Sequence, residues 1–401
     1  MADGVSIPQR GKGFLRAAIV AGALILSGCQ TAVPRGRGPR PIAPPPARAV
    51  PAPTQRVEPG IPIDTQRHRV ALLVPLTGPN AGVGQSLANA TQMALLESKN
   101  ERIRITSYDT NGGAAAAAQR ALADGNRLIL GPLLAEDVRA VAPIARRAGV
   151  PVVSFSNDST AAGNGAYVMG YAPGQSIERV VQYAKGQGVT DFAGLVPNGT
   201  YGERASTAFL RAVEGAGGQV RTLQTYDRAA GSLTAAISRM AQNAPYQGVL
   251  IADGGAGASV AVPLIRKNGG GGAHILGTEL WNSESAIASR PALAGAWFAS
   301  VSDGLYRQYA AKYRARFGTG PYRLSSLGYD AVLLTVRLAR DWPVGSPFPE
   351  ERLRDHGGFA GIDGAFRFGR DDVAERALEV KELRGGTTIV VSPAPSGFGD
   401  R

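Results

Sequence analysis

The side chains that most often perform chemistry are few in this chain, and their spacing matches no catalytic or metal-binding motif. Cys29 is the single cysteine, so no disulfide can form within the chain. The histidines His68, His274 and His356 lie far apart, without the short spacing of zinc ligands, and each is expected at the surface. The sequence contains neither a phosphate-binding P-loop nor a Gly-x-Ser-x-Gly nucleophile motif. We therefore predict a non-enzymatic protein without a metal or cofactor.

The composition indicates a folded and mildly basic protein. Of 401 residues, 44% are hydrophobic and 18% are charged, which is enough apolar material for large cores. The formal net charge of +12 divides into +2 in residues 1–28, +3 in residues 30–66 and +7 over the rest. Because no dense basic stripe results, we do not predict nucleic-acid binding. A weakly positive surface suits contact with anionic lipid or cell-wall polymer.

Residues 1–28 have the pattern of a secretory signal peptide. Three basic residues precede the apolar run Ala17–Leu26, which is too short to span a bilayer of about 30 Å. Small residues then lead to Cys29, and this junction resembles the bacterial lipobox, in which the thiol receives a diacylglycerol before cleavage on the amino side of the cysteine. Gln30 follows the cysteine, and the resemblance to lipoprotein sorting implies transfer to the outer membrane.

Residues 29–66 are predicted to be a lipidated cysteine followed by a linker rich in proline and arginine. Ten of residues 30–66 are proline, whose fixed φ angle favours extended polyproline II structure. At about 3.1 Å per residue, the linker would reach on the order of 110 Å. We expect a tether that holds the folded part away from the periplasmic face of the outer membrane of a Gram-negative bacterium.

The body of the chain is organised around the segment Val70–Ser98. Val70–Val74 is an apolar run typical of a parallel strand that is buried on both faces. The turn-rich segment Pro75–Gly84 follows, and Ser86 is expected to cap a helix. Ligands of open α/β sheets lie beyond the carboxyl ends of the strands, so this corner is predicted to face a ligand.

The remaining body alternates strand and helix patterns. The strand Ile103–Tyr108 precedes the helix Ala114–Ala123, and later the strand Phe192–Val196 precedes the helix Gly202–Glu214. Such alternation predicts mainly parallel sheets with helices on both faces. The pattern occurs twice, on either side of a crossing expected at Gly170–Gly174. We therefore predict an α/β fold of two Rossmann-like lobes with a cleft between them.

The predicted boundaries follow from this repeat. The late helical stretches Leu305–Phe317 and Ser325–Trp342 are expected to return to the first lobe. The predicted divisions are residues 67–171 with 302–345 for the first lobe, residues 172–301 with 346–393 for the second lobe, and residues 394–401 for a tail.

Several segments resemble periplasmic binding proteins of the leucine/isoleucine/valine type. In chain order they are Val70–Ser98, Tyr108–Gly112, Leu130–Leu133, Gly149–Ser154, Gly328–Val332 and Phe359–Phe368. Their order and spacing extend the resemblance over residues 67–392. It implies the type I periplasmic binding protein fold, in which two lobes close on a small ligand about a hinge.

The resemblance also implies a set of binding residues. Amino-acid receptors of this type hold the ligand carboxylate with hydroxyl residues after the third and fourth strands, and the ammonium group with an acid of the second lobe. Here the loop after the third strand lacks a serine at the matching place, whereas the next loop keeps Ser156 and adds Asn157 and Asp158. Glu279 matches the acid, and Tyr201 matches an aromatic residue that would stack on a ligand.

Two functions remain open on the sequence. The narrower resemblance is to lipoproteins that activate penicillin-binding proteins, which combine an outer-membrane lipid, a spacer and this fold. That resemblance implies a regulator of peptidoglycan synthesis whose partner is such a synthase. The alternative is a receptor that delivers an amino-acid-like or amide ligand to the permease of an ABC importer. The anchor favours the first function, because an importer receptor must reach the inner membrane.

Overall fold

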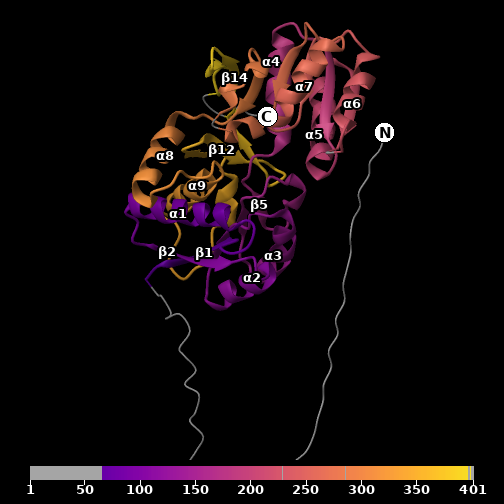
Figure 1. The fold of residues 1–401 in the computed structure, drawn as a ribbon. Coiled ribbons are helices and arrows are strands. Elements are labelled where there is room, and N and C mark those ends of the chain that lie inside the picture. The colour runs from indigo at the N-terminus through magenta and orange to yellow at the C-terminus, as the bar shows by residue number, and fades with distance from the viewer. Residues whose placement is uncertain (1–65, 228, 285, 396–397, 399–401) are drawn as a thin grey trace, which may run out of the picture. The chain divides into compact units, whose positions relative to one another are not determined.

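The computed structural model describes residues 66–227, 229–284, 286–395 and 398. The predicted signal peptide, the linker and Cys29 lie outside the described residues. The described residues all belong to one compact unit, in which the chain folds into two lobes with separate sheets (Figure 1). Within these described ranges, no helix is both long enough and apolar enough to cross a bilayer.

The first lobe is built on a parallel five-stranded sheet in the order β2-β1-β3-β4-β5. Its strands are β1 (His68–Val74), β2 (Ile103–Asp109), β3 (Leu128–Leu130), β4 (Val152–Ser154) and β5 (Ala166–Val168). Its helices are α1 (Ala81–Ser98), α2 (Ala114–Ala123), α3 (Ala135–Arg147), α8 (Gly304–Phe317) and α9 (Ser325–Leu338). The strand predicted at Val70–Val74 thus lies between two parallel neighbours.

The side chains of β1 explain why helices cover both faces of this sheet. Val70, Leu72 and Val74 belong to the core that contains the buried residues of α1 and α9. Ala71 and Leu73 belong to the core formed with α2 and α3. Successive side chains of a strand point to opposite faces, so a continuous apolar run fills two cores. The prediction of a strand buried on both faces is confirmed.

The start of α1 differs from the sequence prediction. The helix begins at Ala81, so Ser86 lies inside it, and the Ser86 hydroxyl accepts a hydrogen bond of 3.1 Å from the backbone N–H of Tyr322. Gly84 makes this early start possible. A Cβ atom at Gly84 would lie 1.8 Å from the carbonyl oxygen of Pro75, so only glycine lets the helix pack this closely on the chain that leaves β1.

The second lobe is built on a seven-stranded sheet in the order β15-β14-β10-β9-β8-β6-β7. Its strands are β6 (Asp191–Pro197), β7 (Gln219–Tyr226), β8 (Gly248–Ile251), β9 (His274–Gly277), β10 (Trp297–Ser300), β14 (Glu379–Arg384) and β15 (Thr387–Ser392). Its helices are α4 (Pro173–Gly186), α5 (Thr200–Gly215), α6 (Ser232–Ala241) and α7 (Gly255–Lys267). The strands from β6 to β10 pair in parallel, whereas β14 and β15 add an antiparallel edge.

A third sheet corrects the predicted lobe boundary. The antiparallel strands β11 (Phe359–Gly361), β12 (Gly364–Phe368) and β13 (Ala374–Arg376) form it. Phe348, Phe359, Phe366 and Phe368 are buried in the core of the first lobe together with α9. The prediction assigned residues 346–393 to the second lobe and was wrong for this part. Short strand patterns show that a segment pairs, but they do not show which lobe receives its side chains.

The chain crosses between the lobes at three places: after β5, after β10 and after β13. Gln175, at the start of α4, joins two of these crossings. Its amide nitrogen donates to the carbonyl oxygen of Ala374 at 2.7 Å, and its amide oxygen accepts from the backbone N–H of Arg376 at 3.0 Å. The crossings therefore form a connected hinge region.

One histidine prediction is also wrong. His68 is only 2% exposed, and its ring stacks on Trp342 with the ring centroids 3.9 Å apart. Burial, together with the charge of Arg102, lowers the pKa of His68. His274 and His356 are exposed, as expected. Across the described part of the chain, no cluster of histidine, cysteine, aspartate or glutamate residues could hold a metal ion.

Candidate ligand-binding site

A cavity of about 360 Å³ lies where the two lobes meet. Its volume is typical of sites that hold one small organic molecule. The first lobe contributes Asn80, Val83, Leu133, Leu134, Phe155, Asn157, Tyr171, Arg323 and Leu324. The crossings and the second lobe contribute Ala172, Gln175, Ser176, Glu279, Leu280, Asn282, Ser283, Ser300, Val301, Arg376 and Leu378. A ligand in this cavity would contact both lobes at once.

The strand ends explain where the cavity lies. Asn80 follows β1, Leu133 follows β3, Phe155 follows β4, Glu279 follows β9, and Val301 follows β10. Parallel strands end at the same edge of their sheet, so each lobe directs its loops toward the other. The corner predicted after Val70–Val74 contributes Asn80 and Val83 to the wall.

Glu279 is the acidic residue on the second-lobe side of the cavity. One of its carboxylate oxygens accepts a hydrogen bond of 2.5 Å from the hydroxyl of Ser176, and the other accepts one of 3.0 Å from the hydroxyl of Tyr201. Burial raises the pKa of Glu279, and the two hydroxyl donors offset part of this effect. The carboxyl group is thus held firmly while its ionised form is disfavoured.

The other predicted site residues are placed differently from one another. Asn157 lines the cavity with Glu279. Ser156 is buried, and its hydroxyl accepts a hydrogen bond of 3.1 Å from the backbone N–H of Asp158. Tyr201 was expected to stack on a ligand, but its hydroxyl contacts Glu279 and the hydroxyl of Thr278 because a buried phenol needs polar partners. Tyr201 therefore supports the acid.

Asp158 joins the lobes instead of lining the cavity. Its buried carboxylate oxygen lies 2.5 Å from Nη2 of Arg139 and 2.5 Å from Nη2 of Arg204. Arg139 belongs to α3 of the first lobe, whereas Arg204 belongs to α5 of the second. Burial alone would raise the pKa of Asp158, but hydrogen bonds from Thr160 and the two arginines lower it overall. The ionised carboxylate thus forms an ion pair between the lobes.

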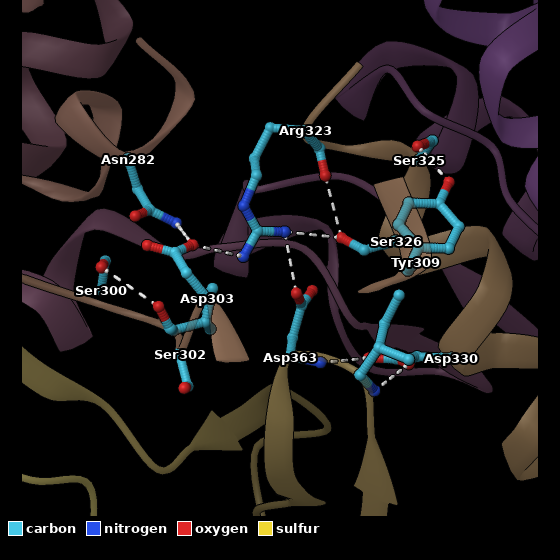
Figure 2. Close-up of polar contacts among 12 residues, drawn as sticks. Asn282, Ser300, Ser302, Asp303, Tyr309, Arg323, Ser325, Ser326, Asp330 and Asp363 are labelled. Carbon is cyan, nitrogen blue, oxygen red and sulfur yellow. Dashed lines mark hydrogen bonds and ion pairs between the residues drawn. The ribbon is translucent and has the colours of Figure 1, made fainter. Parts of the chain in front are cut away.

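Arg323 lies at the centre of a buried polar cluster on the first-lobe side (Figure 2). Its Nη1 atom lies 2.8 Å from Oδ1 of Asp363 and donates to the hydroxyl of Ser326 at 2.9 Å. Figure 2 shows the guanidinium group between Asp363 and Asp303, and Nη2 lies 3.8 Å from a carboxylate oxygen of Asp303. Arg323 also lies over the ring of Tyr306, at 3.9 Å from the centroid.

The two carboxyl groups below Arg323 differ in charge. Burial would raise the pKa of Asp363, but the charges of Arg323 and Arg376 hold it below its ordinary value. Asp330 accepts hydrogen bonds from the backbone N–H groups of Ile362 and Asp363 (Figure 2). Burial and the charge of Asp363 raise the pKa of Asp330 to about 8. The environment therefore favours the ionised form of Asp363 and disfavours that of Asp330.

Arg376 is the second buried cation of the site, and it is 8% exposed. Its Nη2 atom donates to the carbonyl oxygen of Met169 at 2.5 Å. Its guanidinium carbon lies 5.0 Å from the ring centroid of Tyr171 and 5.3 Å from that of Phe366. Sequence reasoning missed Arg323 and Arg376, because neither stands in a spaced motif. The only sequence signal was their position next to the segments Gly328–Val332 and Phe359–Phe368.

The two lobes and the cavity at their strand ends define a bilobal binding protein. Residues 68–386 match the periplasmic binding protein family, and the chain belongs to this family. The prediction of the fold is thereby confirmed. Fold and family are those of non-enzymatic solute-binding proteins, and they imply a periplasmic or extracellular location.

Individual relatives are more distant. The chain is similar to a leucine binding protein from Thermotoga maritima MSB8, with a TM-score of 0.62, 19% identity, and coverage of 82% of this chain and 99% of that chain. It is also similar to an ABC transporter solute-binding protein from R. palustris in complex with benzoate, with a TM-score of 0.62, 17% identity, and coverage of 83% and 98%. These identities show the fold alone.

Among curated proteins, an uncharacterized protein from Rickettsia prowazekii (strain Madrid E) is 30% identical over 139 residues. The match covers 34% of this chain and 37% of that protein.

Proposed function

We propose that this protein is the solute-binding receptor of an ABC importer, which holds a small organic molecule between its lobes. The observation that carries this proposal is the cavity, because it is lined by both lobes and its walls are mainly apolar. The comparisons support this function over activation of a penicillin-binding protein, since the similar solved structures are a leucine binding protein and an ABC transporter solute-binding protein.

A ligand in this position would act on the arrangement of the lobes. It gains contacts from both sides only when the lobes are close together, so binding favours the closed population. The closed lobes would then present one continuous surface to a permease. The connected crossings at Gln175 allow such a motion without separating the lobes.

Thermal unfolding of the purified full chain tests this function. The probes are branched-chain amino acids, amides and aromatic carboxylates, each added at millimolar concentration. A ligand at 100 times its Kd stabilises the folded state by about 2.7 kcal/mol, which raises Tm by several degrees. The proposal predicts that at least one of these solutes raises Tm. If none of them does, the proposal is wrong.

A matched pair of variants shows whether the shift arises in the cavity. Val83→Trp places a large side chain in the wall of the cavity and should abolish the shift. Leu96→Trp changes an exposed residue of the same helix, 51% exposed, and should leave the shift unchanged. Equal shifts in both variants would place the ligand elsewhere.

We further propose that Cys29 anchors the protein to a membrane through a thioether-linked lipid. The sequence around Cys29 supports this anchor. A Cys29→Ser variant should move from the membrane fraction to the soluble periplasmic fraction, whereas a Ser27→Ala control should stay with the membrane. Recovery of Cys29→Ser in the membrane fraction would contradict the lipid anchor.

One observation favours the second candidate function, activation of a penicillin-binding protein. Gln30 after the cysteine supports an outer-membrane position, which separates a receptor from an inner-membrane permease. Copurification of the full chain with a penicillin-binding protein after crosslinking in cells would support this function. Copurification with an ABC permease instead would support the importer.

A further inference from the structure

Two arginines in the wall of the cavity have nitrogen atoms that form no hydrogen bond with the described residues. Arg323 and Arg376 line the cavity. The side chain of Arg323 is 7% exposed, and Arg376 as a whole residue is 8% exposed. In Arg323 the atoms Nε and Nη2 have no hydrogen-bond partner among the described residues, and in Arg376 the same holds for Nε and Nη1. A buried N–H group of a charged side chain is costly when it has no acceptor, so this arrangement calls for one.

The known contacts of Arg376 do not satisfy these atoms. The rings of Tyr171 and Phe366 lie near the guanidinium carbon, but Nε and Nη1 form no hydrogen bond with either residue. The bond to the carbonyl oxygen of Met169 uses Nη2 alone. A purely structural role at the crossing therefore explains one nitrogen of Arg376 and leaves the other two unexplained.

Arg323 and Arg376 differ in their carboxylate partners. Arg323 has Asp363 at 2.8 Å and Asp303 at 3.8 Å, and Asp303 also pairs with Lys381 at 2.5 Å. Lys381 also pairs with Glu379 at 3.3 Å. Arg376, by contrast, forms no ion pair with any carboxylate of the described residues. Both guanidinium groups lie near one ring, with their carbons 5.8 and 5.0 Å from the centroid of Tyr171. Arg376 thus lacks a carboxylate in direct contact among the described residues, and its charge acts on Asp363 only from a longer distance.

We propose that Arg323 and Arg376 form the anion-binding end of the cavity and that the ligand is a small monocarboxylate with an apolar body. In Arg323 the unpartnered Nε and Nη2 lie on one edge of the planar guanidinium group, which suits two parallel hydrogen bonds to a carboxylate. In Arg376 the unpartnered Nε and Nη1 lie on different edges, so each can donate a single charge-assisted hydrogen bond. This inference rests on the proposed function, because both place the ligand in the same cavity.

The remaining walls determine the body of the ligand. Val83, Leu133, Phe155, Leu280, Leu324 and Leu378 line the cavity. Side chains of this kind do not solvate a second charge or a row of hydroxyl groups, so they disfavour dianions and sugars. A cavity of about 360 Å³ gives room for one small aliphatic or aromatic acid.

Isothermal titration calorimetry on the full chain tests the inference with two matched pairs of probes. They are 4-methylpentanoate with 4-methylpentanamide, and benzoate with benzamide, in which an uncharged amide replaces the carboxylate. At least one acid should bind about 10-fold or more tightly than its amide. In Arg376→Gln, the Kd for that acid should rise about 10- to 100-fold, because the charge of Arg376 and a charge-assisted hydrogen bond are lost.

A control and a second readout keep the outcomes distinct. Arg354→Gln removes a cation that lies over Tyr167, outside the cavity, and should leave the acid Kd unchanged. The ratio of the amide Kd to the acid Kd in wild type tests the inference even if Arg376→Gln does not fold. If an amide binds as tightly as its acid, this inference is wrong but the proposed function still stands. The same conclusion follows if an uncharged solute binds and both acids fail to bind. The absence of binding by every solute overturns both.

Discussion

The two lobes have the same scaffold but present different chemistry to the cavity. In the first lobe, Gly84 of α1 packs on the carbonyl oxygen of Pro75, and in the second, Gly202 of α5 packs on that of Pro197. A Cβ atom would lie 1.8 Å from the oxygen in one lobe and 1.6 Å in the other. The same close contact between a strand end and the following helix therefore forms each corner.

The polar groups at these corners are not equivalent. The first lobe presents Arg323, whose charge is fixed by the ionised Asp363. The second lobe presents Glu279, whose ionised form is disfavoured by burial. The comparison teaches that repeated backbone packing determines the fold, whereas a few unrepeated side chains determine the ligand.

The largest effect is expected at Asp363. Asp363→Asn removes the charge that balances Arg323 and should lower the free energy of unfolding by about 3–5 kcal/mol, as for other broken buried ion pairs. Glu279→Gln is the second-lobe counterpart, and it should cost less than about 1.5 kcal/mol because the amide oxygen still accepts a hydrogen bond. Urea denaturation measures both. Equal losses would mean that the lobes are electrostatically alike.

The glycine contacts test the shared scaffold. Gly84→Ala and Gly202→Ala should each destabilise the protein by about 1–3 kcal/mol, because the added methyl group meets a carbonyl oxygen. Gly215→Ala, at the end of α5, has no atom within 4 Å of the added group and should be neutral or slightly stabilising. A large cost in one lobe and none in the other would show that the two corners are not equivalent.

The ion pair between the lobes gives a smaller effect with a clear geometric readout. Arg204→Gln should cost about 1 kcal/mol, because Asp158 keeps Arg139. It should also raise the radius of gyration in small-angle X-ray scattering, since the second lobe loses this link. Arg139→Gln removes a partner from the same lobe and should not change the scattering. Identical scattering curves would exclude a role for Asp158 in holding the lobes together.

The pH dependence of stability should have opposite signs at the two acids. The pKa of Asp158 is lowered on folding, so its stabilisation is present above the unfolded value of about 3.9 and is lost as the pH falls below it. The advantage of wild type over Asp158→Asn should therefore shrink in acid. The pKa of Glu279 is raised on folding, so the cost of Glu279→Gln should be smallest at neutral pH and should grow as the pH falls and wild type gains its proton. Urea midpoints from pH 7 to pH 3 measure both.

Sequence reasoning predicted the elements whose pattern is local. The apolar run Val70–Val74 required burial on two faces, and the alternation of strands and helices required parallel sheets. The site was less accessible. Glu279 and Asn157 follow strands and reached the cavity wall, but Asp158 found its partners on α3 and α5, far away in the sequence.

The missed residues share a physical cause. Arg323 lies between α8 and α9, whereas Arg376 lies at the crossing after β13, so only the folded chain brings both to the cavity wall. No spacing along the chain encodes that meeting. His68 was expected at the surface because it precedes a strand, yet the ring of Trp342 covers it from a segment distant in sequence. Phe348 and Phe359 were likewise misplaced, because their burial in the first lobe depends on the chain returning to that lobe from the second.

The return of the chain also determines when folding can finish. β11 to β13 complete the core of the first lobe, and β14 and β15 complete the sheet of the second. Both lobes thus depend on the segment from β11 to β15, and its contacts span long stretches of sequence. During synthesis neither lobe can complete its core or sheet before this segment has emerged. Truncation near residue 346 should therefore leave two unfinished lobes, and a hybrid that exchanges one lobe with a relative needs a junction at every crossing.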